Sequence, residues 1–160
     1  MRAFHRLETL KEGADLEGLI RSTVSSYTSP DQHNLVLDGS PIRLNANAAA
    51  TCGMIFFELA SNAAKYGALA AENGRVEVAW RNGEKKDFLS VVWKERDGTA
   101  VAEPLKKNFG TTFIQQSLEY ELGGRADLHF KSSGMECVLE IPLSKTDAPA
   151  HHSPASRDRM

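Results

Sequence analysis

The sequence predicts an α+β fold, a two-layer α/β sandwich in which a mixed β-sheet carries its helices on one face. Good helix formers run without proline from about residue 46 to residue 66, which predicts one long central helix. Around it the expected order is helix, two short strands, long helix, two strands, long loop, helix and hairpin. With 160 residues and 41% hydrophobic content, the chain is long enough to bury one core.

The composition is that of an ordinary globular domain and excludes several function classes. A net charge of −2 gives no general attraction to nucleic acid or to anionic membranes, so we expect neither as a partner. The two cysteines lack metal-ligand spacing and indicate buried thiols in a reducing compartment. No apolar run is long enough to span a bilayer and the N-terminus does not begin a signal peptide, so we expect a cytoplasmic location.

The first 45 residues are expected to hold a helix and a small hairpin. Residues 2–12 form a short basic and apolar segment, and a helix is predicted over residues 15–27. One face of that helix collects Leu16, Leu19, Ile20 and Val24. Residues 35–37 and 42–44 are predicted to pair as a hairpin, because a turn-forming Asp-Gly-Ser-Pro run separates them.

The long central helix carries two distinct faces. A core face is predicted from three- and four-residue spacing, and it consists of Ala48, Cys52, Ile55, Leu59, Ala63 and Tyr66. Gly67 is expected to end the helix. Glu58, Asn62 and Lys65 share another face. An amide oxygen, an ammonium and a carboxylate suit a magnesium–triphosphate group, although the spacing alone also fits a solvated face with one ion pair.

The second half of the chain is expected to complete the sheet. Strands are predicted over residues 75–80 and 88–93, and the second is the more apolar and is expected to be central. Residues 96–109 lack periodicity and are expected to form a long loop that acts as a lid.

The last elements are a helix, a hairpin and a tail. The helix is predicted over residues 112–122, with Thr111 opening it and two glycines ending it. A hairpin over residues 126–130 and 135–143 follows. From Ser144 the composition shifts to Pro, Ala, Ser, His and Arg, which predicts a disordered tail over residues 144–160.

The run from Glu58 to Leu69, ELASNAAKYGAL, is similar to the N-box of HWE-family sensor histidine kinases, although the family's eponymous His is Phe57 here. The resemblance implies the Bergerat ATP-binding fold, which histidine kinases share with gyrase and related ATPases. It also implies that Glu58 and Asn62 are catalytic, that Asn62 holds Mg²⁺, and that Lys65 and Tyr66 contact ATP.

A second motif, Trp93-Lys94-Glu95, resembles the Trp-X-Glu motif of the same family. A carboxylate at the end of a strand can accept a hydrogen bond from the adenine amino group, and a glycine lets the backbone turn close to the base. The resemblance makes Glu95 the adenine-contacting carboxylate, with Gly98 beside it. Because the family continues with Gly-Gly-Pro and this chain has Asp97-Gly98-Thr99, Asp97 is an alternative for that contact.

A third motif opens the helix near residue 111. Small residues there expose backbone N–H groups that favour anions, and the run resembles the family's second glycine box, in which Asn108 replaces the first glycine. By that resemblance Gly110, Thr111 and Thr112 cradle the phosphates. An ordinary capped helix start is the alternative.

Together the motifs imply a protein-histidine kinase fragment, with ATP and Mg²⁺ as ligands. Residues 15–143 would be the ATP-binding catalytic domain, and residues 1–14 would be a linker from a dimerisation and phosphoacceptor domain that this chain lacks. That domain would supply the acceptor histidine, since His5 lies too close to Glu58 to leave room for two helices of its own. A response regulator would then receive the phosphoryl group.

Two alternatives come from other classes of function. The first is a degenerate Bergerat-fold domain that binds no nucleotide and serves as a docking or phosphotransfer scaffold. The departures from the family pattern that favour it are Phe57, Asp97, Asn108 and Thr112, where the family often has Arg. The second is a protein-serine kinase of the anti-sigma type, which shares the fold but is disfavoured by the Trp-X-Glu motif.

Overall fold

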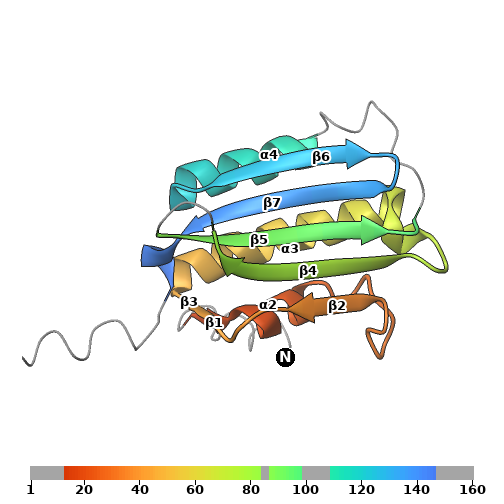
Figure 1. Cartoon of the computed structure of the whole chain (residues 1–160), viewed down its shortest axis with the longest axis horizontal. Helices are drawn as coiled ribbons and strands as arrows, with labels where there is room; N and C mark the ends of the chain where they lie inside the picture. The colour runs from red at the N-terminus through yellow and green to blue at the C-terminus, as the bar shows by residue number, and fades with distance from the viewer. Residues whose placement is uncertain (1–12, 84–86, 99–108, 147–160) are drawn as a thin grey trace, which may run out of the picture.

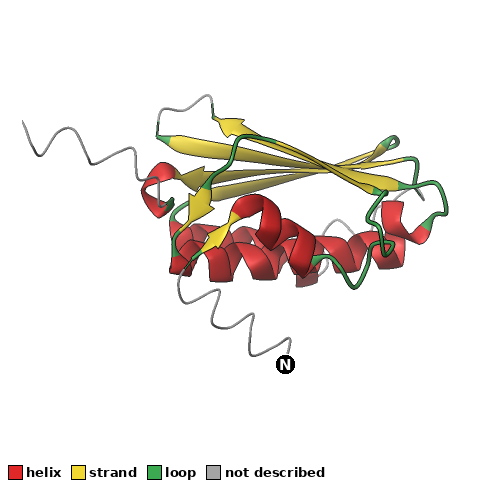
Figure 2. Cartoon of the chain, turned by 90° about the horizontal axis from the view of Figure 1, so that it is seen from below, coloured by secondary structure: helices red, strands yellow, loops and turns green. Residues whose placement is uncertain are grey.

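The structure is a computed structural model that describes residues 13–83, 87–98 and 109–146, arranged in two layers (Figures 1 and 2). The strands are β1 (Ala14–Asp15), β2 (Leu35–Asp38), β3 (Arg43–Leu44), β4 (Arg75–Asn82), β5 (Phe88–Arg96), β6 (Arg125–Lys131) and β7 (Gly134–Pro142). The helices are α2 (Leu16–Thr23), α3 (Ala46–Tyr66) and α4 (Phe109–Ser117), with short turns η1 (Ala68–Ala70), η3 (Leu118–Leu122) and η4 (Leu143–Lys145).

The main sheet has five strands in the order β2-β4-β5-β7-β6, and the helices lie on one of its faces (Figure 2). β2 runs parallel to β4 and the other pairs are antiparallel, so the sheet is mixed. The predicted α+β class is therefore confirmed, and so is the central place of the apolar strand β5.

The hairpin predicted for residues 35–37 and 42–44 is wrong. β2 instead pairs in parallel with β4, and β3 pairs with β1, Leu44 opposite Ala14. Beside β4, Leu35 is buried and Leu37 packs against the core. The crossover from β2 to its parallel neighbour runs through α3, because a parallel pair needs a long connection. A side chain of β4 holds the turn between β2 and β3, since Trp80 Nε1–H donates to the Ser40 carbonyl at 2.7 Å.

α2 begins where the sequence predicts, with the Asp15 carboxylate accepting from the Gly18 N–H at 3.0 Å. It ends at Thr23 rather than near residue 27, so the predicted helix is too long. The reason lies in the serine- and threonine-rich sequence that follows, whose hydroxyls compete for helix carbonyls. Thr23 Oγ1 itself donates to the Leu19 carbonyl at 2.8 Å.

α3 spans 21 residues and matches its predicted bounds. Asn45 caps its start, with Oδ1 accepting from the Ala48 N–H at 2.9 Å, and the Gly67 N–H closes its end on the Ala63 carbonyl. The predicted core face is confirmed except at Tyr66, which is 40% exposed. Tyr66 lies on the last turn, where the helix ends and the side chain has less of the sheet to pack against.

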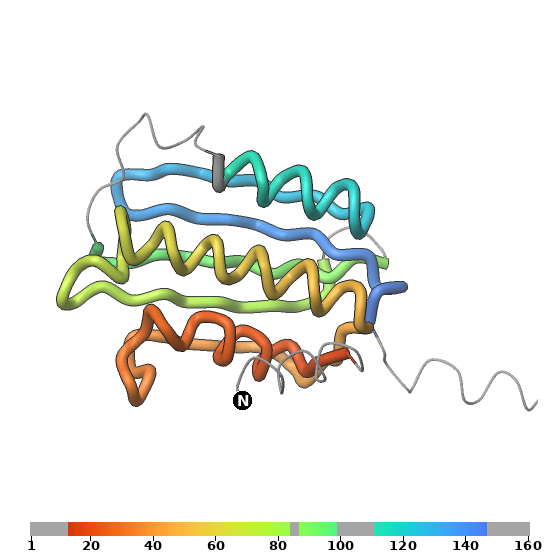
Figure 3. The backbone as a smooth tube through the Cα atoms, turned by 180° about the vertical axis from the view of Figure 1, so that it is seen from behind, coloured from red at the N-terminus to blue at the C-terminus, as the bar shows by residue number. Residues whose placement is uncertain are grey.

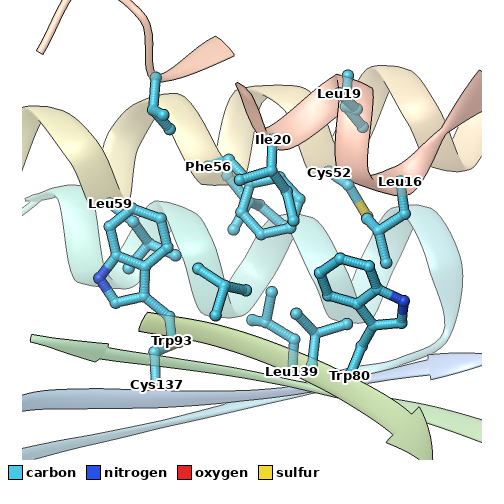
Figure 4. Packing of buried hydrophobic residues seen from close by; sticks show 14 of the residues in the cluster. Leu16, Leu19, Ile20, Cys52, Phe56, Leu59, Trp80, Trp93, Cys137 and Leu139 are labelled. Carbon is cyan, nitrogen blue, oxygen red and sulfur yellow. The ribbon is translucent and has the colours of Figure 1, made fainter. Parts of the chain in front are cut away.

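The core lies between α3 and the sheet (Figure 4). Phe56 of α3 stacks on Trp93 of β5, with ring centroids 6.5 Å apart. Both rings are fully buried, and such pairs add about 0.5–1.5 kcal/mol beyond the area that they bury. Cys52 and Cys137 are buried in the same core as free thiols, as the sequence predicts.

α4 begins at Phe109, three residues earlier than predicted, and continues into the π-helical turn η3. Gly123 ends it in the left-handed conformation (φ 71°), which glycine adopts without strain. The predicted final hairpin is confirmed as β6 and β7.

The fold continues past residue 143 in the described part of the chain. η4 follows β7, and Thr146 forms an isolated bridge with Leu44. The expected linker (apart from Gly13 and Ala14), the lid from residue 99 to 108 and the tail from residue 147 lie outside the described residues. Among the helices that the structure describes, each is too short or too polar to cross a bilayer.

Candidate nucleotide site

Three polar side chains of the first motif lie along one flank of α3. Glu58 and Asn62 are half-buried and Lys65 is exposed. A helix rises about 1.5 Å per residue, so the three span about 10 Å along its axis. Within the described residues, these side chains make no hydrogen bond or ion pair with one another or with a neighbour. Glu58, Asn62 and Lys65 are therefore aligned as predicted. The ion pair expected for an ordinary solvated helix face is not present among the described residues.

α4 lies beside this flank and runs antiparallel to α3 (Figure 3). At one end, Asn47 Nδ2 donates to the Glu121 carbonyl at 3.3 Å. Farther along, Phe113 and Glu58 line the same groove. The N-terminal turn of α4 therefore points toward the half of α3 that carries Asn62 and Lys65.

The third motif forms that N-terminal turn. Gly110 lies inside the first turn rather than before it, because the helix starts at Phe109. Thr111 is buried and Thr112 is exposed. First-turn N–H groups lack an acceptor within their own helix, so the turn has the polarity that favours an anion. Helix α4 thus brings the third motif, at its N-terminal turn, close to the first motif on α3.

The second motif meets the far end of α3. Glu95 is only 4% exposed, and its Oε1 accepts from the Ala68 N–H while its Oε2 accepts from Trp93 Nε1–H, each at 3.1 Å. Burial raises the pKa of this carboxyl, while the two hydrogen bonds act in the opposite direction. The expected base-contacting group is thus next to the N-box, but it is engaged within the protein.

Asp97, the alternative base contact, lies on the surface in an ion-pair network. Its Oδ2 is 2.6 Å from Arg75 Nη1, and Arg75 also pairs with Glu77. Asp97 has a positive φ of 55°, and Gly98 follows it against the backbone of Ala68, where a Cβ would overlap Ala68 atoms. Asp97 therefore forms the turn that brings Gly98 to the end of the N-box.

An apolar groove of about 300 Å³, which was not predicted from the sequence, runs beside Glu58. It lies over α3 between α2 and α4, and it is lined by Leu19, Thr23, Ala50, Gly53, Met54, Phe57, Glu58 and Phe113. Met54 is 56% exposed and Phe57 is 44% exposed, with the Phe57 ring set edge-on to Tyr27 at 5.5 Å. The feature of the sequence that could have indicated the groove is the pair Met54 and Phe57, two large apolar residues on the face of α3 opposite the core.

Two other features lie apart from these residues. A polar hollow of about 340 Å³ occupies the opposite face of the sheet, over β4 and β5. In the described ranges no cluster of His, Cys, Asp and Glu could hold a metal ion by itself. A metal at the N-box would therefore need ligands from phosphate or water as well as Asn62.

Comparison with known proteins gives both relatives and similar folds. No family model matches the chain. The blue-light-activated histidine kinase of Brucella ovis is 27% identical over 151 residues, which cover 91% of this chain. The chain spans about 30% of the length of that relative.

Solved structures share the fold. The histidine kinase domain of the Erythrobacter litoralis EL346 blue-light-activated histidine kinase superposes with a TM-score of 0.60 at 19% identity, covering 79% of this chain and 61% of that one. The catalytic domain of the histidine kinase ThkA gives 0.60 at 16% identity, covering 82% and 95%. With this fold and these relatives, the chain is a homologue of histidine kinase catalytic domains, and the resemblance to the HWE type is confirmed.

Proposed function

We propose that this chain is the ATP-binding catalytic domain of a two-component sensor histidine kinase. It transfers the γ-phosphoryl group of ATP to a histidine on a separate domain, and a response regulator receives the group in turn. The observation that carries the proposal is the row of Glu58, Asn62 and Lys65 on the flank of α3 that faces α4, since these three side chains have no hydrogen bond or ion pair with any residue that the structure describes. The activity would belong to the cytoplasmic part of the parent protein.

The N-box residues suit the phosphate end of ATP. The Asn62 amide oxygen is a hard ligand of the kind that Mg²⁺ prefers, and the Lys65 ammonium neutralises phosphate charge. Bound Mg²⁺ would supply further neutralisation of the phosphates. The first turn of α4, with Gly110, Thr111 and Thr112, binds phosphate oxygens from the other side. Such charge neutralisation and positioning are most of what phosphoryl transfer requires.

Glu58 suits the acceptor end of the reaction. In the transfer, an imidazole nitrogen bonds to the γ-phosphorus as the bond to the ADP oxygen breaks. The Glu58 carboxylate would accept a hydrogen bond from the other ring nitrogen and so favour the attacking tautomer. Its place in the groove with Met54 and Phe57 gives an apolar surface on which an acceptor helix would lie.

The base of ATP would lie at the C-terminal end of α3, where Tyr66 and Gly98 flank the turn after the helix. Tyr66 is exposed and offers a ring for contact with the nucleotide. Glu95 and Asp97 are the carboxylates at this end.

A thermal-unfolding experiment tests the proposal. The midpoints of the wild type and of Asn62→Ala are measured with and without Mg-ATP, and Asn82→Ala on the opposite face of the sheet is the matched control. Ligand at about a hundredfold excess over its Kd adds about 2.7 kcal/mol to the free energy of unfolding and raises the midpoint by several degrees. We expect this magnesium-dependent shift in the wild type and in Asn82→Ala, and its loss in Asn62→Ala.

A degenerate scaffold that binds no nucleotide is the second candidate. The observation that favours it is that both carboxylates near the base end already have partners, Glu95 with Ala68 and Trp93, and Asp97 with Arg75. Absence of any midpoint shift in the wild type, with a folded protein, would establish this candidate. If nucleotide binds, the product with partner proteins is tested for acid-labile phosphohistidine against acid-stable phosphoserine, which separates the two kinase classes.

A further inference from the structure

The carboxylate of Glu95 is positioned between the core and the end of the N-box. Its two oxygens accept from the Ala68 N–H and from Trp93 Nε1–H, each at 3.1 Å, and the side chain is almost fully buried. Ala68 is the first residue of η1, directly after the glycine that ends α3. The carboxylate therefore joins β5 to the turn that follows the N-box helix.

Glycines make this junction close. A Cβ at Gly67 would overlap Glu95 Oε1, and a Cβ at Gly98 would overlap the Ala68 backbone. Gly74 approaches the Ala68 carbonyl in the same way, and Gly134 approaches the Glu95 carbonyl. The turn, the end of β5 and the β6–β7 hairpin thus meet with no space between them, so a displacement of one element moves the others.

We propose that Glu95 is a positioning residue, which acts on the nucleotide through the Gly67–Ala68 turn and not through a hydrogen bond to the adenine amino group. The inference rests on the proposed nucleotide site, because it concerns how that site is held. Lys65 precedes the turn by two residues and Gly98 lies against it. The Glu95 carboxylate therefore fixes both the C-terminal end of α3 and the point where the chain leaves β5.

The physical reason is the cost of leaving buried donors without an acceptor. The Ala68 N–H and the Trp93 indole N–H lie in the interior, and Glu95 is the acceptor that satisfies both. Without it each donor loses a bond that it cannot replace with water except by opening the turn. The tryptophan and the glutamate of the Trp-X-Glu motif are thus two parts of one hydrogen-bonded unit.

The first test follows the Ala68 amide by hydrogen exchange in the absence of nucleotide. Glu95→Met removes both acceptor oxygens at nearly constant side-chain size. Glu95→Gln keeps one acceptor oxygen, and it serves as the test variant if Glu95→Met does not fold. Glu140→Met, on the opposite face of β7, is the matched control. We expect exchange at Ala68 to quicken about tenfold in Glu95→Met, by less in Glu95→Gln, and to stay unchanged in the control. Amides in the middle of α3 should keep wild-type protection.

The second test is a double-substitution cycle between residue 95 and the base. Affinities of the wild type and the Glu95 variants are measured for Mg-ATP and for the magnesium complex of purine riboside triphosphate, which lacks the 6-amino group. The temperature is one at which every variant is fully folded. A positioning role lowers both affinities by the same factor, so the ratio of the two stays at its wild-type value. A purely structural role would change neither affinity in the folded protein.

The outcomes are distinct. Unchanged Ala68 exchange together with a selective loss of ATP affinity means that Glu95 reads the adenine directly, and this overturns the inference. Changed Ala68 exchange with both affinities intact overturns it too, since the junction would then have no effect on the site. If the wild type binds neither nucleotide, the proposed function fails, and faster Ala68 exchange would still show the junction in a scaffold domain.

Discussion

At the scale of single residues, the environment of a side chain decides its chemistry more than its place in a motif does. Glu58 and Glu95 are both motif carboxylates. Glu58 lies half-buried in a groove and has no hydrogen-bond partner among the described residues, while the buried Glu95 accepts hydrogen bonds from two donors. The first is available to a reacting group, and the second belongs to the framework of the site.

The buried carboxyl gives a prediction about pH. Burial raises the pKa of Glu95 from its ordinary value of 4.5, so the folded state holds the proton to a higher pH than the unfolded state does. Its stabilising contribution is present below about pH 4.5 and is lost as the pH rises through the folded-state pKa. The midpoint of the wild type minus that of Glu95→Gln should therefore fall as the pH rises through this window. Thermal unfolding of both proteins at a series of pH values measures this difference in midpoint.

The matching control is Glu140→Gln, a substitution at a carboxyl on the opposite sheet face. Comparison of the two variants separates the effect of the buried site from that of any carboxyl-to-amide substitution in this sheet. A wild-type advantage over Glu95→Gln that grows with rising pH would mean that the hydrogen bonds from Ala68 and Trp93 outweigh burial.

At the scale of elements, α3 organises the molecule because it serves two surfaces at once. One side packs Phe56 and Leu59 against the sheet, and the flank toward α4 presents Asn62 and Lys65. The start of this helix is set by Asn45, whose side chain caps the Ala48 N–H at 2.9 Å. A helix that packs against the sheet on one side and presents polar side chains on another must start at a defined residue. The Asn45 cap helps to define that start.

Loss of this cap should lower stability without removing the site. Asn45→Ala is expected to reduce the free energy of unfolding by about 1 kcal/mol, because the Ala48 N–H loses its acceptor. Urea denaturation gives the value, and Asn45→Ser, which can cap, should restore most of it. The midpoint shift with Mg-ATP should persist in both. An unchanged stability in Asn45→Ala would show that the cap contributes nothing here.

The groove beside Glu58 gives a prediction at the same scale. Met54→Asp puts a charge into an apolar surface that an acceptor helix would cover, so the proposed function predicts that phosphoryl transfer to a separate phosphoacceptor domain falls at least about tenfold. Binding of Mg-ATP should be unchanged. Tyr120→Asp is the matched control, since Tyr120 is an exposed apolar residue on η3 that does not line the groove.

The assay mixes this domain with the separate phosphoacceptor domain and follows phosphohistidine over time. Equal rates for Met54→Asp and the wild type would mean that the acceptor approaches from another side of the molecule.

At the scale of the whole molecule, one continuous core joins both layers. Cys52 comes from α3 and Cys137 from β7, and burial raises the pKa of each thiol to about 12. A thiol with so high a pKa, and without access to solvent, reacts only when the fold opens. The two cysteines therefore report the opening of the helix layer and of the sheet.

We expect both thiols to be alkylated at the same slow rate in the native protein and quickly in denaturant. Mg-ATP should slow both reactions by a common factor, because ligand stabilises the closed state. Mass spectrometry of alkylated peptides measures the two rates. Rapid labelling of Cys52 alone would show that α3 detaches from the sheet before the sheet opens.

The sequence by itself determined the fold class, the bounds of α3, the central strand and the final hairpin. These are local properties: a long run of helix formers that a glycine ends, the apolar run of β5, and two strand-forming runs on either side of a turn. The N-box and Trp-X-Glu residues also identified the relatives, because side-chain identity and spacing are written in the chain. The row of Glu58, Asn62 and Lys65 follows from helical geometry alone.

Tertiary structure decided what depends on residues far apart in the chain. The partner of β2 is β4 rather than its neighbour β3, because a strand pairs where its side chains find the core, and Tyr66 leaves the core because α3 ends there. The acceptor role of Glu95 toward Ala68 joins residues 27 positions apart, and the groove needs three helices to form. Spacing along a chain cannot show whether a carboxylate is free or held, since that depends on which donors the fold brings to it.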